Sequence, residues 1–156
     1  MRQCTLVFLN KPNEQKILLA MKKRGFGVGK WNGVGGKLNE CETIKEAAIR
    51  ETREEIAVEI RPEDLANVAV IDFFFEGKKE FDQQVHAFFV EKWQSEPTES
   101  EEMKPEWYSY SKLPFEKMWI DDAHWLPRAI AGEKLKAKFV FNEDGSELIS
   151  KEIDIL

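Results

Sequence analysis

Three glutamates, at positions 51, 54 and 55, have the spacing of a metal-binding site on a helix. Residues three and four apart share a helix face, and here they continue the apolar stripe that starts at Ile44. Near the negative end of a helix, three carboxylates repel one another unless a cation neutralises them. Neither Cys nor His lies beside them, so Mg²⁺ or Mn²⁺ is favoured over zinc.

A solvated acidic surface is the alternative interpretation of the same residues. In that case Arg50 and Arg53 would pair with Glu54 and its neighbours on an exposed face. Metal binding is favoured by the continuity with the apolar stripe and by a further carboxylate, Glu42, just before the helix. The residue types alone leave both interpretations open.

A glycine-rich loop leads into this helix. Six of the nine glycines lie in RGFGVGKWNGVGGK, residues 24–37. Glycine permits a positive φ and lets a ligand approach the backbone closely. The spacing matches neither the dinucleotide-binding fingerprint nor the phosphate-binding P-loop, so the loop is either a plain connector or part of a different site.

Hydrophobic periodicity predicts an α/β fold in one domain, residues 1–156, with a mixed sheet and two helices. The first helix spans Ile44 to Ile56, with Thr43 and Glu46 forming a capping box. The second spans about Asp121 to Ala131, with an aspartate as cap and Gly132 after its end. Seven strands are predicted: Gln3 to Leu9, Ile17 to Met21, Val68 to Phe75, Val85 to Trp93, Glu106 to Tyr110, Lys136 to Phe141 and Leu148 to Ile155.

Composition excludes several classes of protein. The formal charge of −6 disfavours binding to a nucleic-acid polymer, because such binding usually needs a basic surface. The N-terminus has no signal-peptide pattern, and no apolar run approaches the roughly 20 residues of a membrane span. Cys4 and Cys41 lie far apart and are expected to be free thiols. We expect a cytoplasmic, membrane-independent monomer.

The segment GKLNECETIKEAAIRETREEIAV, residues 36–58, resembles the Nudix box, Gly-x5-Glu-x7-Arg-Glu-U-x-Glu-Glu-x-Gly-U, where U is aliphatic. The positions that match are Gly36, Glu42, Arg50, Glu51, Glu54, Glu55 and Val58.

Three positions depart from the family's pattern. Thr52 replaces an aliphatic residue, while Cys41 and Ala57 replace common glycines. If position 57 needs left-handed geometry, alanine costs roughly 1 to 2 kcal/mol there. No departure removes a carboxylate, so the resemblance still implies catalysis.

Further segments resemble the MutT-type members of this family that remove oxidised purine nucleoside triphosphates. They are LLAMKKRGFGVGKWNGVGGK, EEMKPEW and LPFEKMWIDDAHWLP, so the likeness covers nearly the whole chain. It implies a Nudix α/β/α sandwich with the mixed sheet between helices, and dependence on Mg²⁺, with Mn²⁺ as a substitute. The implied reaction converts 8-oxo-dGTP, and also 2-oxo-dATP and O6-methyl-dGTP, to the monophosphate and pyrophosphate, which sanitises the nucleotide pool.

The resemblance assigns metal binding to five residues and leaves the general base open among the glutamates. Arg50 would orient the carboxylates. Glu99 or Glu101 could be the metal ligand in place of Glu102. The implied metal ligands are the Gly36 carbonyl, Glu51, Glu54, Glu55 and Glu102.

The resemblance also implies a substrate pocket, in which aromatic side chains stack on the purine and polar groups read its edge. Lys22, more than its neighbours Lys23 and Arg24, would meet the triphosphate. Two adjacent aspartates in a dry pocket cannot cheaply both ionise, so one would stay protonated as a donor. The implied residues are Thr5, Lys22, Phe26, Asn32, Val34, Gly35, Gly36, Lys37, Phe73, Met103, Trp119, Asp121, Asp122 and Trp125.

Alternatives remain for the pocket and for the function. Each aromatic residue could simply belong to the core, and the aspartates could only cap a helix. Val34 stands where mammalian-type members have a larger aromatic residue, which bears on substrate range. The chain could also hydrolyse another nucleoside diphosphate derivative, such as a nucleotide sugar, or be a nucleotide-binding module without turnover.

Overall fold

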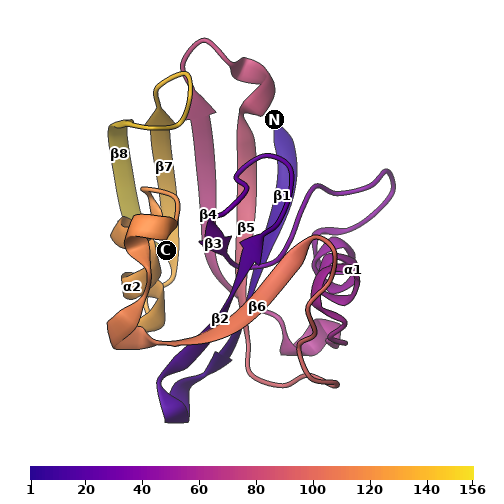
Figure 1. Ribbon diagram of the computed structural model, residues 1–156. Coiled ribbons are helices and arrows are strands. Elements are labelled where there is room, and N and C mark those ends of the chain that lie inside the picture. The colour runs from indigo at the N-terminus through magenta and orange to yellow at the C-terminus, as the bar shows by residue number, and fades with distance from the viewer.

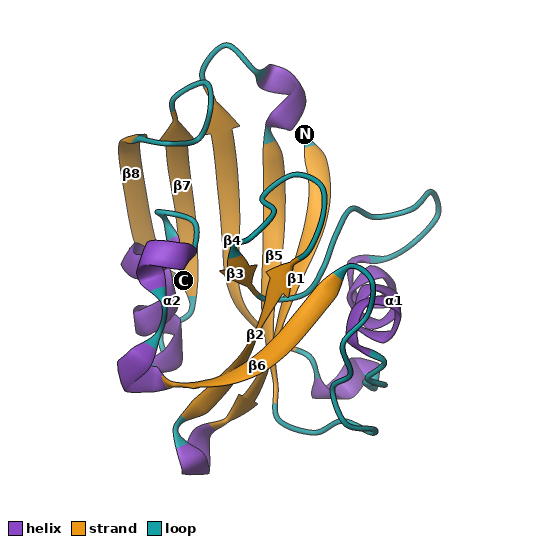
Figure 2. Ribbon diagram, in the orientation of Figure 1, coloured by secondary structure: helices purple, strands orange, loops and turns teal.

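One mixed sheet of eight strands carries both helices in the computed structural model, which describes residues 1–156 (Figure 1). Figure 2 shows the sheet in orange between the two α-helices; the other purple coils are short 3₁₀ turns. The elements are β1 (Arg2–Lys11), β2 (Lys16–Lys22), β3 (Trp31–Asn32), α1 (Ile44–Ile56), β4 (Ala66–Phe75), β5 (Gln83–Val90), β6 (Met103–Ser109), α2 (Asp122–Ile130), β7 (Leu135–Phe141) and β8 (Leu148–Ile155).

The strand order is β3-β2-β1-β5-β4-β7-β8, and β6 pairs with β2. Strands β1 and β5 run parallel, as do β4 and β7, whereas the other pairs are antiparallel. The prediction of a mixed sheet is therefore confirmed. Neither helix has the length and hydrophobicity that crossing a membrane requires.

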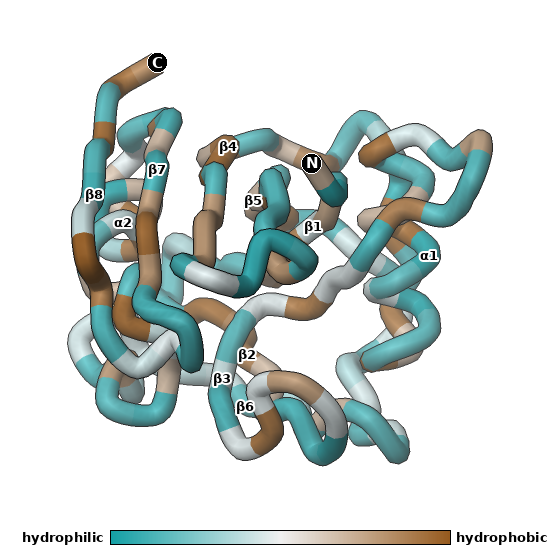
Figure 3. The backbone as a smooth tube through the Cα atoms, turned by 90° about the horizontal axis from the view of Figure 1, so that it is seen from above, coloured by the Kyte–Doolittle hydropathy of each residue, from teal (hydrophilic) through white to brown (hydrophobic).

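Alternate residues of the central strands enter two different cores. Phe8 of β1 packs in the core that includes Trp125 and Leu126 of α2. Its neighbour Val7 packs in the second core, with Ala48 of α1. Because successive strand residues point to opposite faces, the two helices cover opposite faces of the sheet. Figure 3 shows α1 and α2 at opposite sides of the molecule. The predicted α/β/α arrangement is confirmed.

The ends of α1 follow the predicted pattern. Thr43 Oγ1 accepts a hydrogen bond from the Glu46 amide at 3.1 Å, and the Glu46 carboxylate accepts one from the Thr43 amide at 2.9 Å. At the other end Ala57 has φ 60° and ψ 32°, which is left-handed geometry. Cys41, the other residue in a usual glycine position, has φ 61°. Ala57 and Cys41 therefore both adopt a backbone conformation that glycine adopts more easily.

Several predicted boundaries were wrong. Strand β5 ends at Val90 rather than Trp93, whose ring instead stacks on Trp107 with centroids 5.9 Å apart. Strand β6 begins at Met103 rather than Glu106. The prediction started too late because the strand includes Pro105, and proline normally argues against a strand. The two-residue β3 was missed because it is too short to show a period.

Candidate active site

The glycine loop reaches the carboxylate helix at Gly36. A Cβ atom on Gly36 would lie 2.8 Å from Glu51 Cδ, closer than real side chains approach. A Cβ atom on Gly35 would lie 1.9 Å from the Thr5 carbonyl oxygen. The Gly36 carbonyl accepts a hydrogen bond from the Thr5 amide at 2.8 Å, which ties the loop to β1. Only glycine fits at position 35, because a side chain there would collide with the β1 backbone, whereas a side chain at position 36 would displace the Glu51 carboxylate.

Glu55 is the buried member of the carboxylate face. Its Oε2 accepts a hydrogen bond from the Gly35 amide at 3.1 Å, and only 7% of the residue is exposed. Burial raises the pKa of Glu55 to about 8, and the negative charge of Glu51 adds to the effect. A nearby cation would oppose this rise, because it favours the charged form.

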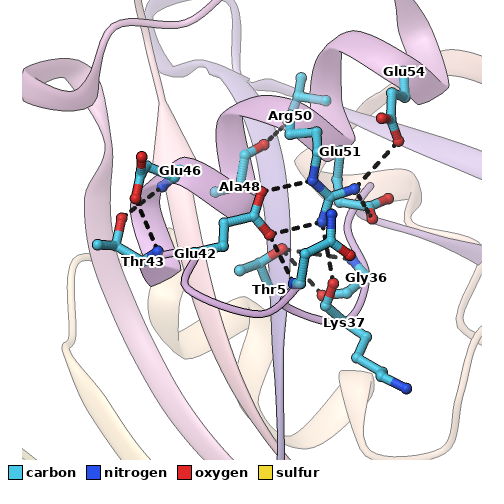
Figure 4. Close-up of polar contacts among 12 residues, drawn as sticks. Thr5, Gly36, Lys37, Glu42, Thr43, Glu46, Ala48, Arg50, Glu51 and Glu54 are labelled. Carbon is cyan, nitrogen blue, oxygen red and sulfur yellow. Dashed lines mark hydrogen bonds and ion pairs between the residues drawn. The ribbon is translucent and has the colours of Figure 1, made fainter.

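Arg50 holds the acidic residues around it in place (Figure 4). Its Nε and one terminal nitrogen donate to both oxygens of Glu42, at 2.7 and 2.9 Å. The other terminal nitrogen donates to Glu51 at 2.7 Å and to Glu54 at 3.3 Å. A further bond at 3.2 Å reaches the Lys37 carbonyl at the end of the glycine loop. Arg50 thus connects the helix, the loop and the carboxylates. Arg53 pairs with Glu59 rather than with Glu54.

The donor set at this end of α1 suits a hard divalent cation, although it is not gathered into a ready-made cluster. No group of three or more His, Cys, Asp and Glu side chains is close enough to hold a metal ion. Glu54 and Glu102 have half-exposed side chains paired with Arg50 and Arg24. All five candidate ligands offer oxygen atoms, and the missing Cβ of Gly36 leaves its backbone open beside Glu51. These donors fit Mg²⁺ or Mn²⁺.

The acidic loop before β6 is tied to the residues after β2. Lys23 Nζ donates to the Ser100 carbonyl at 2.8 Å and also pairs with Glu99. Arg24 donates to Glu102 at 3.2 Å, whereas its contact with Glu101 is longer, at 3.9 Å. Lys23 and Arg24 therefore position the loop, which leaves Lys22 as the lysine of this group on the cavity wall.

A cavity of about 330 Å³ lies beside the carboxylate helix. It is lined by aromatic rings, two side-chain amides, two aspartates and several backbone segments of the glycine loop. Of the predicted substrate residues, the structure brings together Thr5, Lys22, Phe26, Asn32, Gly35, Gly36, Lys37, Phe73, Met103, Trp119, Asp121, Asp122 and Trp125.

Val34 lies away from the cavity, whereas Thr5 lines the cavity and also contacts the glycine loop. Val34 is buried in the core beneath α1, and its backbone pairs with Val7. Its side chain does not line the cavity, because the loop turns there to leave Gly35 and Gly36 facing it. Thr5 Oγ1 lies 3.4 Å from the Gly36 carbonyl, to which it donates, so this hydroxyl supports the loop.

Aromatic residues from distant segments meet at Trp119. Its ring centroid lies 5.3 Å from that of Phe26, and Lys30 Nζ lies 5.0 Å from its ring. Phe26 is 54% exposed and stacks on Phe81 at 5.3 Å, with an angle of 11° between the planes. Trp125 is fully buried against Phe8, so it is both core and pocket wall. The exposed Phe26 therefore lies at the mouth of the cavity.

The two aspartates are buried at the start of α2, where Asp121 occupies the N-cap position. Neither makes the side-chain bond of a helix cap, and Asp121 Oδ2 instead accepts a hydrogen bond from Trp125 Nε1 at 3.0 Å. Asp122 Oδ2 is buried without any partner. Burial raises the pKa of both carboxyls, and the negative charge of Asp121 adds to the rise for Asp122. These raised pKa values agree with the expectation that one of the two carboxyls keeps its proton.

Several lining residues were missed from the sequence. Phe141 ends β7, and Cys4 and Gln83 come from β1 and β5, which pair in parallel although they lie about 80 residues apart. The alternation of the strands could have marked these side chains as inward-facing. Their common location depends on strand pairing, which no local pattern specifies. The missed residues of the cavity wall are Arg2, Cys4, Leu6, Ala20, Gly27, Lys30, Gly33, Phe75, Gln83, Val85 and Phe141.

The fold and the glutamate helix define a NUDIX domain: the family model of that description matches residues 2–129, and the chain belongs to this family. Among curated proteins, it is 42% identical over 147 residues to the mouse oxidized purine nucleoside triphosphate hydrolase, covering 94% of this chain and 91% of the relative. It is also 42% identical over 137 residues to the zebrafish protein of that name, covering 88% and 85%.

A solved structure supports the fold independently. The mMutator MutT protein from Bacillus halodurans superposes with a TM-score of 0.80 over 99% of this chain and 98% of that one. Its sequence identity is 23%, so the likeness concerns the arrangement of the elements alone.

Proposed function

We propose that this protein hydrolyses oxidised purine nucleoside triphosphates, such as 8-oxo-dGTP, to the monophosphate and pyrophosphate. The mouse and zebrafish relatives are both named oxidized purine nucleoside triphosphate hydrolase, which supports this class of substrate. In the cell the reaction would keep oxidised nucleotides out of the pool used for DNA synthesis.

The observation that carries the proposal is the buried carboxyl oxygen of Asp122, which lacks a partner on the wall of an aromatic cavity. Leaving a buried polar atom unpaired costs about 1 to 3 kcal/mol. A bound base that hydrogen-bonds to Asp122 would remove this cost. With one proton shared between them, Asp121 and Asp122 can offer both a donor and an acceptor to the edge of a purine.

Aromatic side chains would hold the base in the cavity. Trp119 and Phe26 lie at its mouth, and Phe73 stacks within a row of rings that includes Phe139 and Phe141. A planar purine gains stacking energy between such faces. Asn32 Oδ1 accepts a bond from the Gly33 amide at 2.8 Å, which leaves the amide N–H groups of Asn32 for the base.

The carboxylate end of α1 would receive the triphosphate. Glu51, Glu54, Glu55, Glu102 and the Gly36 carbonyl would hold Mg²⁺ or Mn²⁺, which polarises phosphoryl oxygens and activates a water molecule. Arg50 would fix the orientation of the glutamates through its bonds to Glu42, Glu51 and Glu54. Lys22 would add positive charge for the phosphates from the cavity wall.

A pyrophosphate-release assay tests the proposal. The substrates are dGTP, 8-oxo-dGTP, 2-oxo-dATP, O6-methyl-dGTP, ADP-ribose and a dinucleoside polyphosphate, each with and without Mg²⁺. We expect the highest kcat/KM with an oxidised purine triphosphate and loss of turnover in Glu54→Gln. Selective turnover of ADP-ribose would contradict the substrate class, and release equal in Glu54→Gln would contradict the catalytic site.

The aspartate pair is tested in the same assay. Asp121→Asn and Asp122→Asn, made separately, should change the preference between 8-oxo-dGTP and 2-oxo-dATP, because each substitution fixes a donor where the pair could otherwise shift its proton. Unchanged activity of both variants toward both bases would rule out recognition by a shared proton. Thermal melts show whether each variant is folded.

A further inference from the structure

A second amide lines the base pocket, on the side formed by β1 and β5. The Cys4 thiol donates a hydrogen bond to Gln83 Oε1 at 3.2 Å. Both residues line the cavity, and Cys4 is only 8% exposed. Parallel pairing of the strands places Cys4 beside Val85 and Gln83 beside Arg2, so the two side chains meet across the β1–β5 boundary.

The bond to Cys4 decides which end of the Gln83 amide is available. Because the thiol engages the carbonyl, the N–H₂ group is the end without a hydrogen bond inside the protein. Burial raises the pKa of Cys4, so the thiol keeps the proton that it donates. Asn32 repeats the arrangement, since its carbonyl accepts from Gly33. The pocket therefore holds two amides whose carbonyl ends are engaged and whose donor ends are not.

We infer that Gln83 is a specificity-determining residue, which donates an amide N–H to a carbonyl oxygen of the bound purine. This inference rests on the proposed function and adds a donor to the groups assigned above. The aspartate pair lies at the start of α2 and Asn32 lies in β3, whereas Gln83 is the first residue of β5. A base with carbonyl groups would thus meet donors from separate parts of the fold, and adenine, which has no carbonyl, would not engage Gln83.

Two substitutions at Gln83 distinguish the effect of its N–H donor from the effect of its side-chain volume. Gln83→Met keeps the length of the side chain without a donor, and Gln83→Glu keeps its shape but offers only acceptors when ionised. Gln84→Met is the matched control, because Gln84 points to the other face of β5 and donates to Asp72 at 2.8 Å. Thermal melts of all three variants verify folding.

Calorimetric titration with 8-oxo-dGMP in the absence of metal measures base recognition apart from catalysis. We expect the Kd to rise about tenfold in Gln83→Met, as for the loss of one hydrogen bond, and further in Gln83→Glu. Gln84→Met should bind like wild type. In steady-state assays with Mg²⁺, the kcat/KM of Gln83→Met should fall about tenfold for 8-oxo-dGTP and change less than about twofold for dATP.

The outcomes distinguish this inference from the proposed function. If wild type binds 8-oxo-dGMP and Gln83→Met binds it equally well, only the role of Gln83 is refuted. Equal losses for 8-oxo-dGTP and dATP would also refute it, because they would indicate a general change of the pocket. If wild type neither binds 8-oxo-dGMP nor hydrolyses 8-oxo-dGTP, the proposed function is refuted and the inference with it.

The contact with Cys4 has a separate test. Cys4→Ser keeps a hydroxyl donor and should bind 8-oxo-dGMP more tightly than Cys4→Ala. Cys4→Ala frees the Gln83 carbonyl, so the amide can turn, and the Kd should rise about twofold to fivefold. Equal affinities of the serine and alanine variants would show that the thiol does not orient Gln83.

Discussion

Replacing Ala57 with glycine is expected to raise the free energy of unfolding. Ala57 ends α1 with φ 60° and ψ 32°, a conformation that costs a non-glycine residue about 1 to 2 kcal/mol. Glycine loses more conformational entropy on folding, which offsets about 0.5 to 1 kcal/mol of that gain. The Ala57 side chain is exposed, so its removal sacrifices no core packing. The net gain lies between about 0 and 1.5 kcal/mol, with a central value of about 0.7 kcal/mol.

The chain contains a matched control at the end of its other helix. Ala131 ends α2 and is also exposed, but its φ is −74°, an ordinary right-handed value. Ala131→Gly therefore has the entropy cost without relieving strain, and its free energy of unfolding should fall by about 0.5 to 1 kcal/mol. In a domain of this size, thermal melts should shift the Tm by about +2 °C for Ala57→Gly and −2 °C for Ala131→Gly. Destabilisation by Ala57→Gly, or shifts of the same sign in both variants, would refute the reasoning.

Three further predictions concern the site. Asp122→Asn should make the free energy of unfolding depend less on pH. Burial raises the pKa of Asp122 in the folded state above its ordinary value of 3.8. The protonated carboxyl therefore contributes its full stability at low pH, and this contribution is lost as the pH rises through the folded-state pKa. Thermal melts from about pH 4 to pH 8 measure this, and slopes equal to wild type would contradict it. Gly36→Ala should lower kcat about tenfold to a hundredfold, because the new Cβ atom would lie 2.8 Å from Glu51 Cδ and displace that carboxylate. Steady-state kinetics with a circular-dichroism check of folding test it, and a kcat within twofold of wild type would contradict it. Arg50→Lys should lose about 1 to 2 kcal/mol in urea unfolding, since a lysine cannot make the two parallel bonds to Glu42. A midpoint equal to wild type would show that the paired bonds add no stability.

The local pattern of the sequence was sufficient for α1. The capping box at Thr43 follows from residue types at fixed spacings, because a cap depends on neighbours a few residues away. The positive φ at Ala57 needed the structure, because alanine itself does not indicate left-handed geometry. Strand boundaries were less accurate. Pro105 obscured the start of β6, and Trp93 left the ladder to stack on Trp107, a contact between segments distant in sequence.

The sequence by itself determined the carboxylate face of α1, the glycine loop before it and the likeness to a family, since each is written in short stretches of chain. Tertiary structure alone decided that Val34 packs into a core while Gly35 and Gly36 face the cavity. It also decided that Gln83 lines the cavity, with its side-chain carbonyl accepting a hydrogen bond from Cys4. The physical reason is that parallel pairing of β1 and β5 joins residues about 80 positions apart, and such contacts depend on the whole sheet rather than on local preference.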